Sequence, residues 1–139
     1  MSVPHHLQRF VDAQDAVYEQ VCEELRRGRK TSHWMWYIFP QLAGLGHSEM
    51  ARRFAIASRA EALAYLDHPV LGPRLQECTN WITRVEDRPI GKILGYPDNL
   101  KFRSSMTLFA NVAAAPQLFL GALHKFFAGE PDPMTIRLL

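Results

Sequence analysis

The sequence predicts an all-α protein, a single-domain multihelical bundle of about seven helices that spans residues 1–139. Apolar residues recur at intervals of three and four along most of the chain, which is the spacing of one helix face. Strand signals are weak, because no segment sustains an apolar–polar alternation and no Asn-Gly or Asp-Gly pair marks a hairpin. A chain of this length is one domain by the usual prior and buries enough surface for its own core. A mixed α+β fold is the alternative.

The first helical region is expected over residues 5–27, with a break near 12–15. Its inward face consists of apolar side chains at helical spacing, namely Leu7, Phe10, Val11, Tyr18, Val21, Cys22 and Leu25. Gly28 ends this region. Thr31 or Ser32 is expected to cap the next helix, which closes at Pro40 because proline interrupts helical hydrogen bonding.

Two serine caps organise the middle of the chain. Ser48 follows a glycine-containing turn over 44–48 and is expected to cap a helix. The expected inward side chains after that cap are Met50, Phe54 and Ile56. Ser58 and Glu61, three residues apart, form a capping box for a helix over 60–66.

The helical pattern continues to the C-terminus. Pro73 suits the first turn of a helix that stops before Pro89. One apolar stripe along it is formed by Leu71, Leu75, Cys78, Ile82 and Val85. Further helices are expected over 90–94 and 101–114, from Pro116 to Gly129, and as a final turn over 135–139.

Composition and charge are those of an ordinary globular protein, with 47% hydrophobic residues, 22% charged residues and a net charge of +2. No apolar run reaches the roughly 18 residues of a membrane span, and the N-terminus resembles no secretory signal, so a cytoplasmic protein is expected. Cys22 and Cys78 are expected to be free buried thiols. No cofactor and no metal are expected, since phosphate-binding glycine motifs and histidine ligand spacings are absent.

Basic residues gather at 26–30 and at Arg52-Arg53. A solvated basic face is the simpler interpretation, and attraction of an anion or phosphate is the alternative. A net charge of +2 is too small to indicate a nucleic-acid partner, so none is expected.

The segment 30–41 places four aromatic rings within six residues, beside a lysine, a histidine, hydroxyls and an amide. Aromatic side chains form rigid pocket walls, while Lys and His supply charge and proton-transfer capacity. The same composition is found in a well-anchored core helix. Trp34 and Trp36 point to different sides of a helix, so one is expected in the core, and Trp36 is the candidate for a pocket wall.

Dense motifs extend across nearly the whole chain. In the first half they are Arg9-Phe10, Ala13-Gln14, Gly28-Arg29-Lys30, Ser32-His33-Trp34-Met35-Trp36, Phe39-Pro40-Gln41, Gly44-Leu45-Gly46 and Ser48. In the second half they are Glu61-Ala62, Tyr65-Leu66, Leu71-Gly72, Arg74-Leu75, Pro97-Asp98, Lys101, Ser104-Ser105-Met106-Thr107-Leu108-Phe109, Phe126-Phe127 and Asp132. From residue 7 to residue 139 this pattern resembles the bacterial family filed as domain of unknown function 1810.

The resemblance implies a small all-helical fold and no established activity. Some relatives carry the label calpastatin, which does not fit, because an inhibitor of that type is largely disordered and this chain has a core. The family pattern usually has Tyr where this chain has Phe54, so no hydroxyl role is carried over to that position.

Two groups of residues in these motifs, distant in sequence, make up the candidate binding site: Lys30, His33, Trp36, Gln41, Asp98, Lys101, Ser104 and Ser105. Lys101, Ser104 and Ser105 share one face of a helix by their spacing. If Asp98 or Asn99 caps that helix, its first turn offers free N–H groups to an anion.

The charged candidates each have a structural alternative. Lys30 suits a phosphate or carboxylate, or is an exposed lysine at a helix start. His33 and Asp98 are the acid–base candidates, or a hydrogen-bonded structural histidine and an N-cap aspartate.

The neutral candidates have structural alternatives too. Gln41 orients a ligand through its amide or bonds a loop. Ser104 and Ser105 donate hydrogen bonds to an oxyanion or allow close helix packing, and no motif around them indicates nucleophilic catalysis.

Three functions fit these observations. The first is binding of a small anionic molecule, such as a nucleotide-like ligand, in an aromatic-walled pocket between helices. The second is a protein-interaction or regulatory module without catalytic activity, with an exposed aromatic patch around Trp34, Trp36 or Trp81. The third, nucleic-acid binding through the arginine clusters, predicts salt-dependent affinity. The sequence names no reaction, so whether the protein is an enzyme stays open.

Overall fold

The structure is a computed structural model that describes residues 6–139. The helices of this range are α1 (Gln8–Asp15), α2 (Tyr18–Arg26), α3 (Met35–Ile38), α4 (Glu49–Arg53), α5 (Arg59–Asp67), α6 (Leu71–Thr83), α7 (Ile90–Leu94), α8 (Asp98–Val112), α9 (Gln117–Phe127) and α10 (Pro133–Leu138). Within residues 6–139 the only β-type pairing is an isolated bridge between Leu42 and Ile56. The all-α prediction is therefore confirmed.

The predicted number of about seven helices is wrong, because residues 6–139 form ten. The region predicted over 5–27, whose first residue lies outside the described range, contains both α1 and α2. They separate at Ala16 and Val17, where α1 turns toward α3 while α2 continues along α6. No glycine or proline marks this break. The helices α3, α4, α7 and α10 have only four to six residues, a length at which packing rather than local propensity decides helix formation.

Serine caps form as predicted at α4 and α5 but not at α3. The hydroxyls of Ser48 and Ser58 each accept a hydrogen bond from the backbone N–H three residues later. The N-cap of α3 is Trp34, with no side-chain cap bond. Ser32, one of the two predicted caps, instead donates its hydroxyl to the carboxylate of Glu24 at 2.6 Å.

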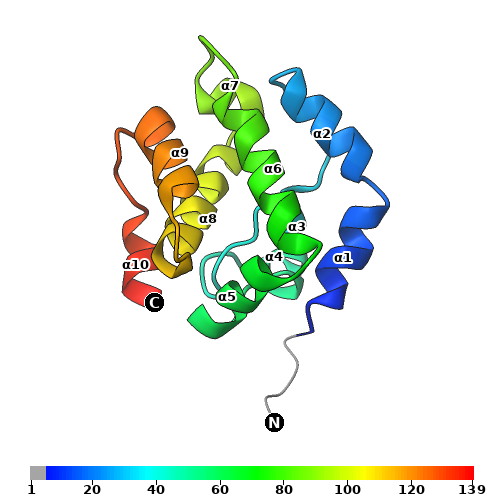
Figure 1. The fold of residues 1–139 in the computed structure, drawn as a ribbon, viewed down its shortest axis with the longest axis vertical. Helices are drawn as coiled ribbons and strands as arrows, with labels where there is room; N and C mark the ends of the chain where they lie inside the picture. Colours follow the sequence, from blue (N-terminus) through cyan, green and yellow to red (C-terminus); the bar gives the residue numbers. More distant parts are fainter. Residues whose placement is uncertain (1–5) are drawn as a thin grey trace.

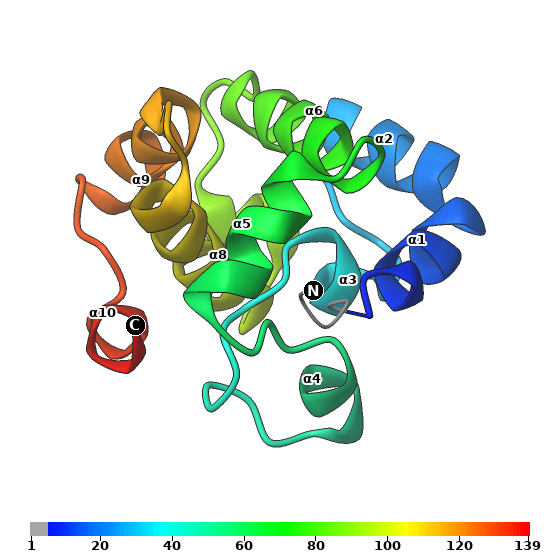
Figure 2. The same ribbon diagram turned by 60° about the horizontal axis from the view of Figure 1, so that its bottom comes forward.

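The helices α6 and α8 occupy the centre of the bundle (Figure 1). The first contacts α2, α5 and α9, and the second contacts α5, α7, α9 and α10. Figure 2 shows α4 and its flanking loops extending beyond the longer helices. No helix in the described range is long and apolar enough to cross a membrane.

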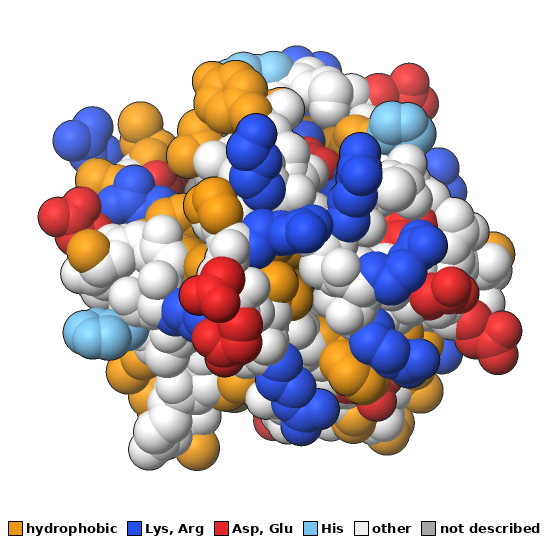
Figure 3. All heavy atoms as spheres, turned by 90° about the horizontal axis from the view of Figure 1, so that it is seen from above, with side chains coloured by type: hydrophobic (Ala, Val, Ile, Leu, Met, Phe, Trp, Pro, Cys, Tyr) orange, Lys and Arg blue, Asp and Glu red, His pale blue; other side chains and the backbone are white. Residues whose placement is uncertain are grey.

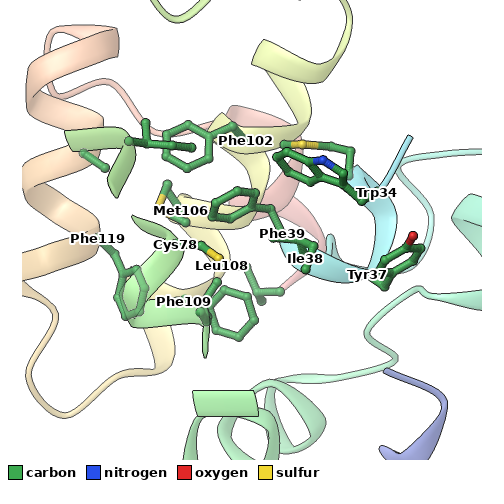
Figure 4. Close-up of a cluster of buried hydrophobic side chains, with 14 of the residues drawn as sticks. Trp34, Tyr37, Ile38, Phe39, Cys78, Phe102, Met106, Leu108, Phe109 and Phe119 are labelled. Carbon is green, nitrogen blue, oxygen red and sulfur yellow. The ribbon is translucent and has the colours of Figure 1, made fainter. Parts of the chain in front are cut away.

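The aromatic segment at residues 34–39 belongs largely to the core. Trp34 is 1% exposed, and the ring of Phe39 packs edge-on against Phe102 of α8, with centroids 5.0 Å apart. Figure 4 shows the Phe39 ring among Cys78 of α6 and Phe102, Met106 and Leu108 of α8, with Trp34 at the edge of this cluster. The loop that precedes α3 passes close to the start of α8, since Lys30 in this loop contacts Asp98.

Candidate functional site

A buried carboxylate fixes the loop that carries the first group of candidate residues. Glu24, on α2, is 1% exposed. Its Oε1 accepts the backbone N–H groups of Thr31 and Ser32, at 2.8 and 3.1 Å, and the indole N–H of Trp34 at 3.0 Å. Its Oε2 accepts the Ser32 hydroxyl and the amide of Gln20 at 3.1 Å. The loop between α2 and α3 is thus folded around one side chain.

These hydrogen bonds stabilise the charged form of Glu24. Burial alone raises the pKa of a carboxyl group, since it removes water from the charge. Here the donors from Ser32, Thr31 and Trp34 outweigh burial and lower the pKa of Glu24 to about 2. The carboxylate therefore stays ionised and keeps its donors in place across the physiological pH range.

The loop directs Lys30 toward the start of α8. Its Nζ lies 2.8 Å from Oδ2 of Asp98, and its side chain is only 8% exposed. Lys101, one turn into α8, places its Nζ 3.4 Å from Oδ1 of the same carboxylate. Two candidate groups that are distant in sequence are therefore joined through Asp98, which we call the Lys–Asp–Lys bridge (Lys30, Asp98 and Lys101).

Each lysine of the bridge also lies over a tryptophan ring. The Nζ of Lys30 is 5.1 Å from the ring centroid of Trp34, and the Nζ of Lys101 is 5.0 Å from that of Trp36. Such contacts stabilise a cation that has lost part of its hydration. Two positive charges around one carboxylate leave the bridge with a net charge of +1, so it attracts a further anion.

A pocket of about 440 Å³ opens beside Lys101. Its walls come from the 41–51 segment, the first turns of α8 and the start of α10. Three of the candidate residues line it: Gln41, Lys101 and Ser104. Apolar side chains, among them Leu100 and Met134, provide much of the remaining wall. Apolar walls with a few convergent polar groups are the usual composition of a small-molecule site.

The two adjacent serines of α8 face different environments. The hydroxyl of Ser104 lies 3.2 Å from the carboxylate of Asp132, which caps α10. Asp132 also accepts both the backbone N–H and the hydroxyl of Thr135. Ser105 is fully buried, its hydroxyl has no hydrogen-bond partner, and it does not line the pocket.

Other candidates lie beside the pocket rather than in it. Trp36 is half-buried under Lys101 and is not part of the pocket wall. His33 is exposed, and its backbone oxygen accepts a weak bond from the Tyr37 hydroxyl at 3.4 Å. The structure thus brings Lys30, Asp98 and Lys101 together and leaves His33 apart.

Sequence reasoning missed Glu24, the residue that holds the loop, as well as His47, which lines the pocket. A signal for Glu24 exists. It lies three residues after Val21 and beside Leu25 on the predicted apolar face, and donors at positions 31, 32 and 34 follow it. An acid on an apolar helix face, close to a cluster of donors, indicates a buried hydrogen-bonded carboxylate.

Metal coordination finds no support within residues 6–139, where no three His, Cys, Asp or Glu side chains gather as metal ligands. The predicted cap of α8 by Asp98 or Asn99 is wrong, because the N-cap is Pro97 and no side chain makes a cap bond there. The carboxylate of Asp98 faces the two lysines instead.

Comparison with known proteins places this architecture in a family. The sequence model of the family described as protein of unknown function (DUF1810) matches residues 4–139. The crystal structure of the conserved hypothetical protein Rv1873 from Mycobacterium tuberculosis is similar over 99% of this chain and 98% of that one, with 53% identity and a TM-score of 0.97. No protein of curated function matches. Because the family model covers nearly all of the sequence, this chain belongs to the DUF1810 family.

Proposed function

We propose that this protein binds a small anionic molecule in the pocket beside Lys101. One observation carries the proposal: Lys101 lines an amphipathic pocket while Lys30, from a distant loop, shares the charge of Asp98. The ammonium group of Lys101 has three donors, and Asp98 occupies only part of that capacity. A carboxylate or phosphate of the ligand would accept the others.

The charge that favours an anionic ligand comes from the Lys–Asp–Lys bridge beside the pocket, because the pocket wall itself carries one lysine and one aspartate. Asp132 is the acidic residue of the pocket wall, and its Oδ2 accepts hydrogen bonds from Thr135 and Ser104. Those donors hold its charge at the N-terminus of α10. Lys101 and His47 are the basic residues of the wall.

The remainder of the ligand would be apolar or planar. Leu45, Pro97, Leu100 and Met134 form the apolar part of the wall. Among residues 6–139 the side-chain amide of Gln41 has no hydrogen-bond partner, so it is available to orient a polar group. The aromatic surface near the charge is Trp36, which Lys101 covers, so displacement of Lys101 toward a ligand would expose this ring.

The burial of the three tryptophans argues against the alternative function, a protein-interaction module with an exposed aromatic patch. Trp34 is buried, and Trp36 and Trp81 are half-buried beneath basic side chains. Rings covered in this way offer a partner protein little apolar surface.

A differential thermal-shift screen tests the proposal. Small carboxylates, phosphates and nucleotides would be titrated into the parent protein and into K101Q, with R52Q as the matched control, since Arg52 is exposed on α4 and is not part of the pocket wall. A ligand at one hundred times its Kd raises the free energy of unfolding by about 2.7 kcal/mol. We expect stabilisation of the parent and of R52Q, and at least about tenfold weaker binding to K101Q. Equal stabilisation of all three would refute the proposal.

A further inference from the structure

A second basic site lies at the opposite end of the bundle from α4 and α10. A hollow of about 420 Å³ is lined by Arg29, Arg88 and Lys92, together with Asp87 and Pro89. We call these five residues the basic hollow. Three cations face one carboxylate there, so its formal net charge is +2.

The hollow is built by backbone contacts between two turns. The N–H of Lys30 donates to the carbonyl of Ile93 at 2.7 Å, which places Arg29 beside the helix that carries Lys92. The guanidinium of Arg88 donates to the carbonyl of Gly28 at 3.0 Å. Both bonds join the turn after α2 to the segment 86–94.

Gly28 permits this close approach. Its φ is +73°, and a Cβ at this position would lie 3.1 Å from a methyl group of Val85. A larger residue would be strained at this φ and would press on the Val85 side chain, directly before the segment that carries Arg88.

Few ion pairs or hydrogen bonds within the described residues engage the cations of the basic hollow. Arg29 and Lys92 are exposed and have neither an ion pair nor a hydrogen bond from their side chains among the described residues. Within the described part of the chain, the Arg88 side chain makes one hydrogen bond, to the Gly28 carbonyl, so most of its donors have no partner there. Three cations with a single carboxylate, Asp87, among them leave an excess of positive charge, which suits a ligand with several negative charges.

The basic surface continues beyond the hollow. Arg26 and Arg27 end α2, and Arg84 ends α6. Arg26 and Arg84 both lie over the ring of Trp81, at 4.7 and 5.5 Å from its centroid. Figure 3 shows Lys and Arg side chains predominating over acidic ones across the middle of this face.

We propose that the basic hollow binds phosphate groups of a polyphosphorylated ligand. The sequence alone favoured a solvated basic face, with attraction of an anion or phosphate as the alternative. The structure adds Arg88 and Lys92 from a distant segment and places them with Arg29 around one hollow. The phosphates belong either to a free oligophosphate compound or to the backbone of a nucleic acid.

The test uses inorganic tripolyphosphate, followed by calorimetry, and a fluorescein-labelled single-stranded oligodeoxythymidine, followed by anisotropy, both at low ionic strength. The variant is R29Q/K92Q, which removes two exposed side chains that have no partner within residues 6–139 and is expected to keep the parent Tm. The control is R52Q/R137Q, which removes the same charge from α4 and α10 at the other end of the molecule (Figure 1).

We expect at least one probe to bind the parent and the control equally, and R29Q/K92Q to bind at least about tenfold more weakly. If the oligonucleotide binds through three contacts, the logarithm of its affinity falls with that of salt concentration with a slope of about −2, and about −0.7 for R29Q/K92Q. Binding of tripolyphosphate alone indicates a free oligophosphate, and a steeper oligonucleotide slope indicates a nucleic acid that reaches Arg26, Arg27 and Arg84. Both results support the proposal.

Two outcomes overturn it: neither probe binds at low ionic strength, or the control loses as much affinity as R29Q/K92Q. The variant K101Q separates this site from the pocket of the proposed function, because it lowers binding there and leaves tripolyphosphate binding unchanged. Failure at one site therefore says nothing against the other.

Discussion

The indole N–H of Trp34 donates a 3.0 Å hydrogen bond to Oε1 of Glu24, so the largest buried ring of the core is fixed by a buried charge. The same oxygen accepts the N–H groups of Thr31 and Ser32. One carboxylate thus determines both the position of a core tryptophan and the course of the loop that carries Lys30. Stability and the geometry of the proposed site depend on the same interaction.

The variant Glu24→Gln is expected to lose about 2–4 kcal/mol of free energy of unfolding. Its amide offers one acceptor oxygen and places an NH₂ group against donors that need an acceptor. Urea denaturation measures the loss, and E23Q is the control, because Glu23 is the exposed neighbour on the same helix. A loss below 1 kcal/mol, relative to E23Q, would contradict the anchoring role of Glu24.

Stability should fall at acid pH through the same group. The pKa of Glu24 is about 2 in the folded protein, below its ordinary value of 4.5. Its stabilising contribution is therefore complete above pH 4.5 and is lost as the pH falls toward 2. When the pH is lowered from about 6 to about 3, protonation of Glu24 alone should reduce the free energy of unfolding by about 2 kcal/mol. Denaturation curves at the two pH values measure this reduction. It should be smaller by about the same amount in E24Q, which lacks the carboxylate.

The sequence predicts those parts of the fold that local interactions decide. The Ser48 and Ser58 caps and the apolar stripe of α6 from Leu71 to Ile82 form as expected, because a cap or a helix face depends on neighbours three or four residues away. The helix ends at Thr83, so Val85, the last predicted member of the stripe, lies beyond it. The break between α1 and α2 and the short helix α3 depend instead on which distant helix each segment packs against. No local signal contains that information.

The candidate site follows the same division. Lys30, Asp98 and Lys101 are recognisable as polar residues near helix starts, and the structure joins them. Their neighbours Ser104 and Ser105 cannot be distinguished by spacing alone. Successive residues of a helix point in different directions, so the Ser104 hydroxyl lies against Asp132 and the Ser105 hydroxyl lies in the core.

Removal of the central charge of the Lys–Asp–Lys bridge should destabilise the protein. In D98N the buried ammonium of Lys30 loses its counterion, at a cost of about 1–3 kcal/mol. The double variant K30M/D98N should be more stable than the sum of the single losses indicates, by at least about 1 kcal/mol. A double-mutant cycle from urea denaturation measures this coupling, and strict additivity would show that the ion pair contributes nothing.

The two cysteines are free, as predicted, but only Cys78 is buried and Cys22 is half-buried, so they should differ in reactivity. The Cys22 thiol donates to Glu77 at 3.6 Å and the Cys78 thiol donates to Tyr18 at 3.9 Å. The neighbouring Cys78 thiol lowers the pKa of Cys22, while Cys22 and burial raise the pKa of Cys78. Iodoacetamide at neutral pH should therefore alkylate Cys22 in the native protein, while Cys78 reacts only after unfolding. Peptide mass spectrometry after a short exposure distinguishes them, with C22S as the control. Preferential labelling of Cys78 would contradict this arrangement.

The variant Ser105→Ala tests whether Ser105 is a buried structural residue or a ligand-binding residue. Its hydroxyl lies in the core without a partner, so removal of the oxygen should leave stability unchanged or raise it by up to about 1 kcal/mol. Ser104→Ala should instead lose about 1 kcal/mol, because its hydroxyl joins α8 to the Asp132 cap of α10. Thermal denaturation compares the two variants. Since Ser105 does not line the pocket, S105A should also retain the full affinity for any ligand that K101Q weakens, and a loss of affinity in S105A would assign the binding site to the core side of α8.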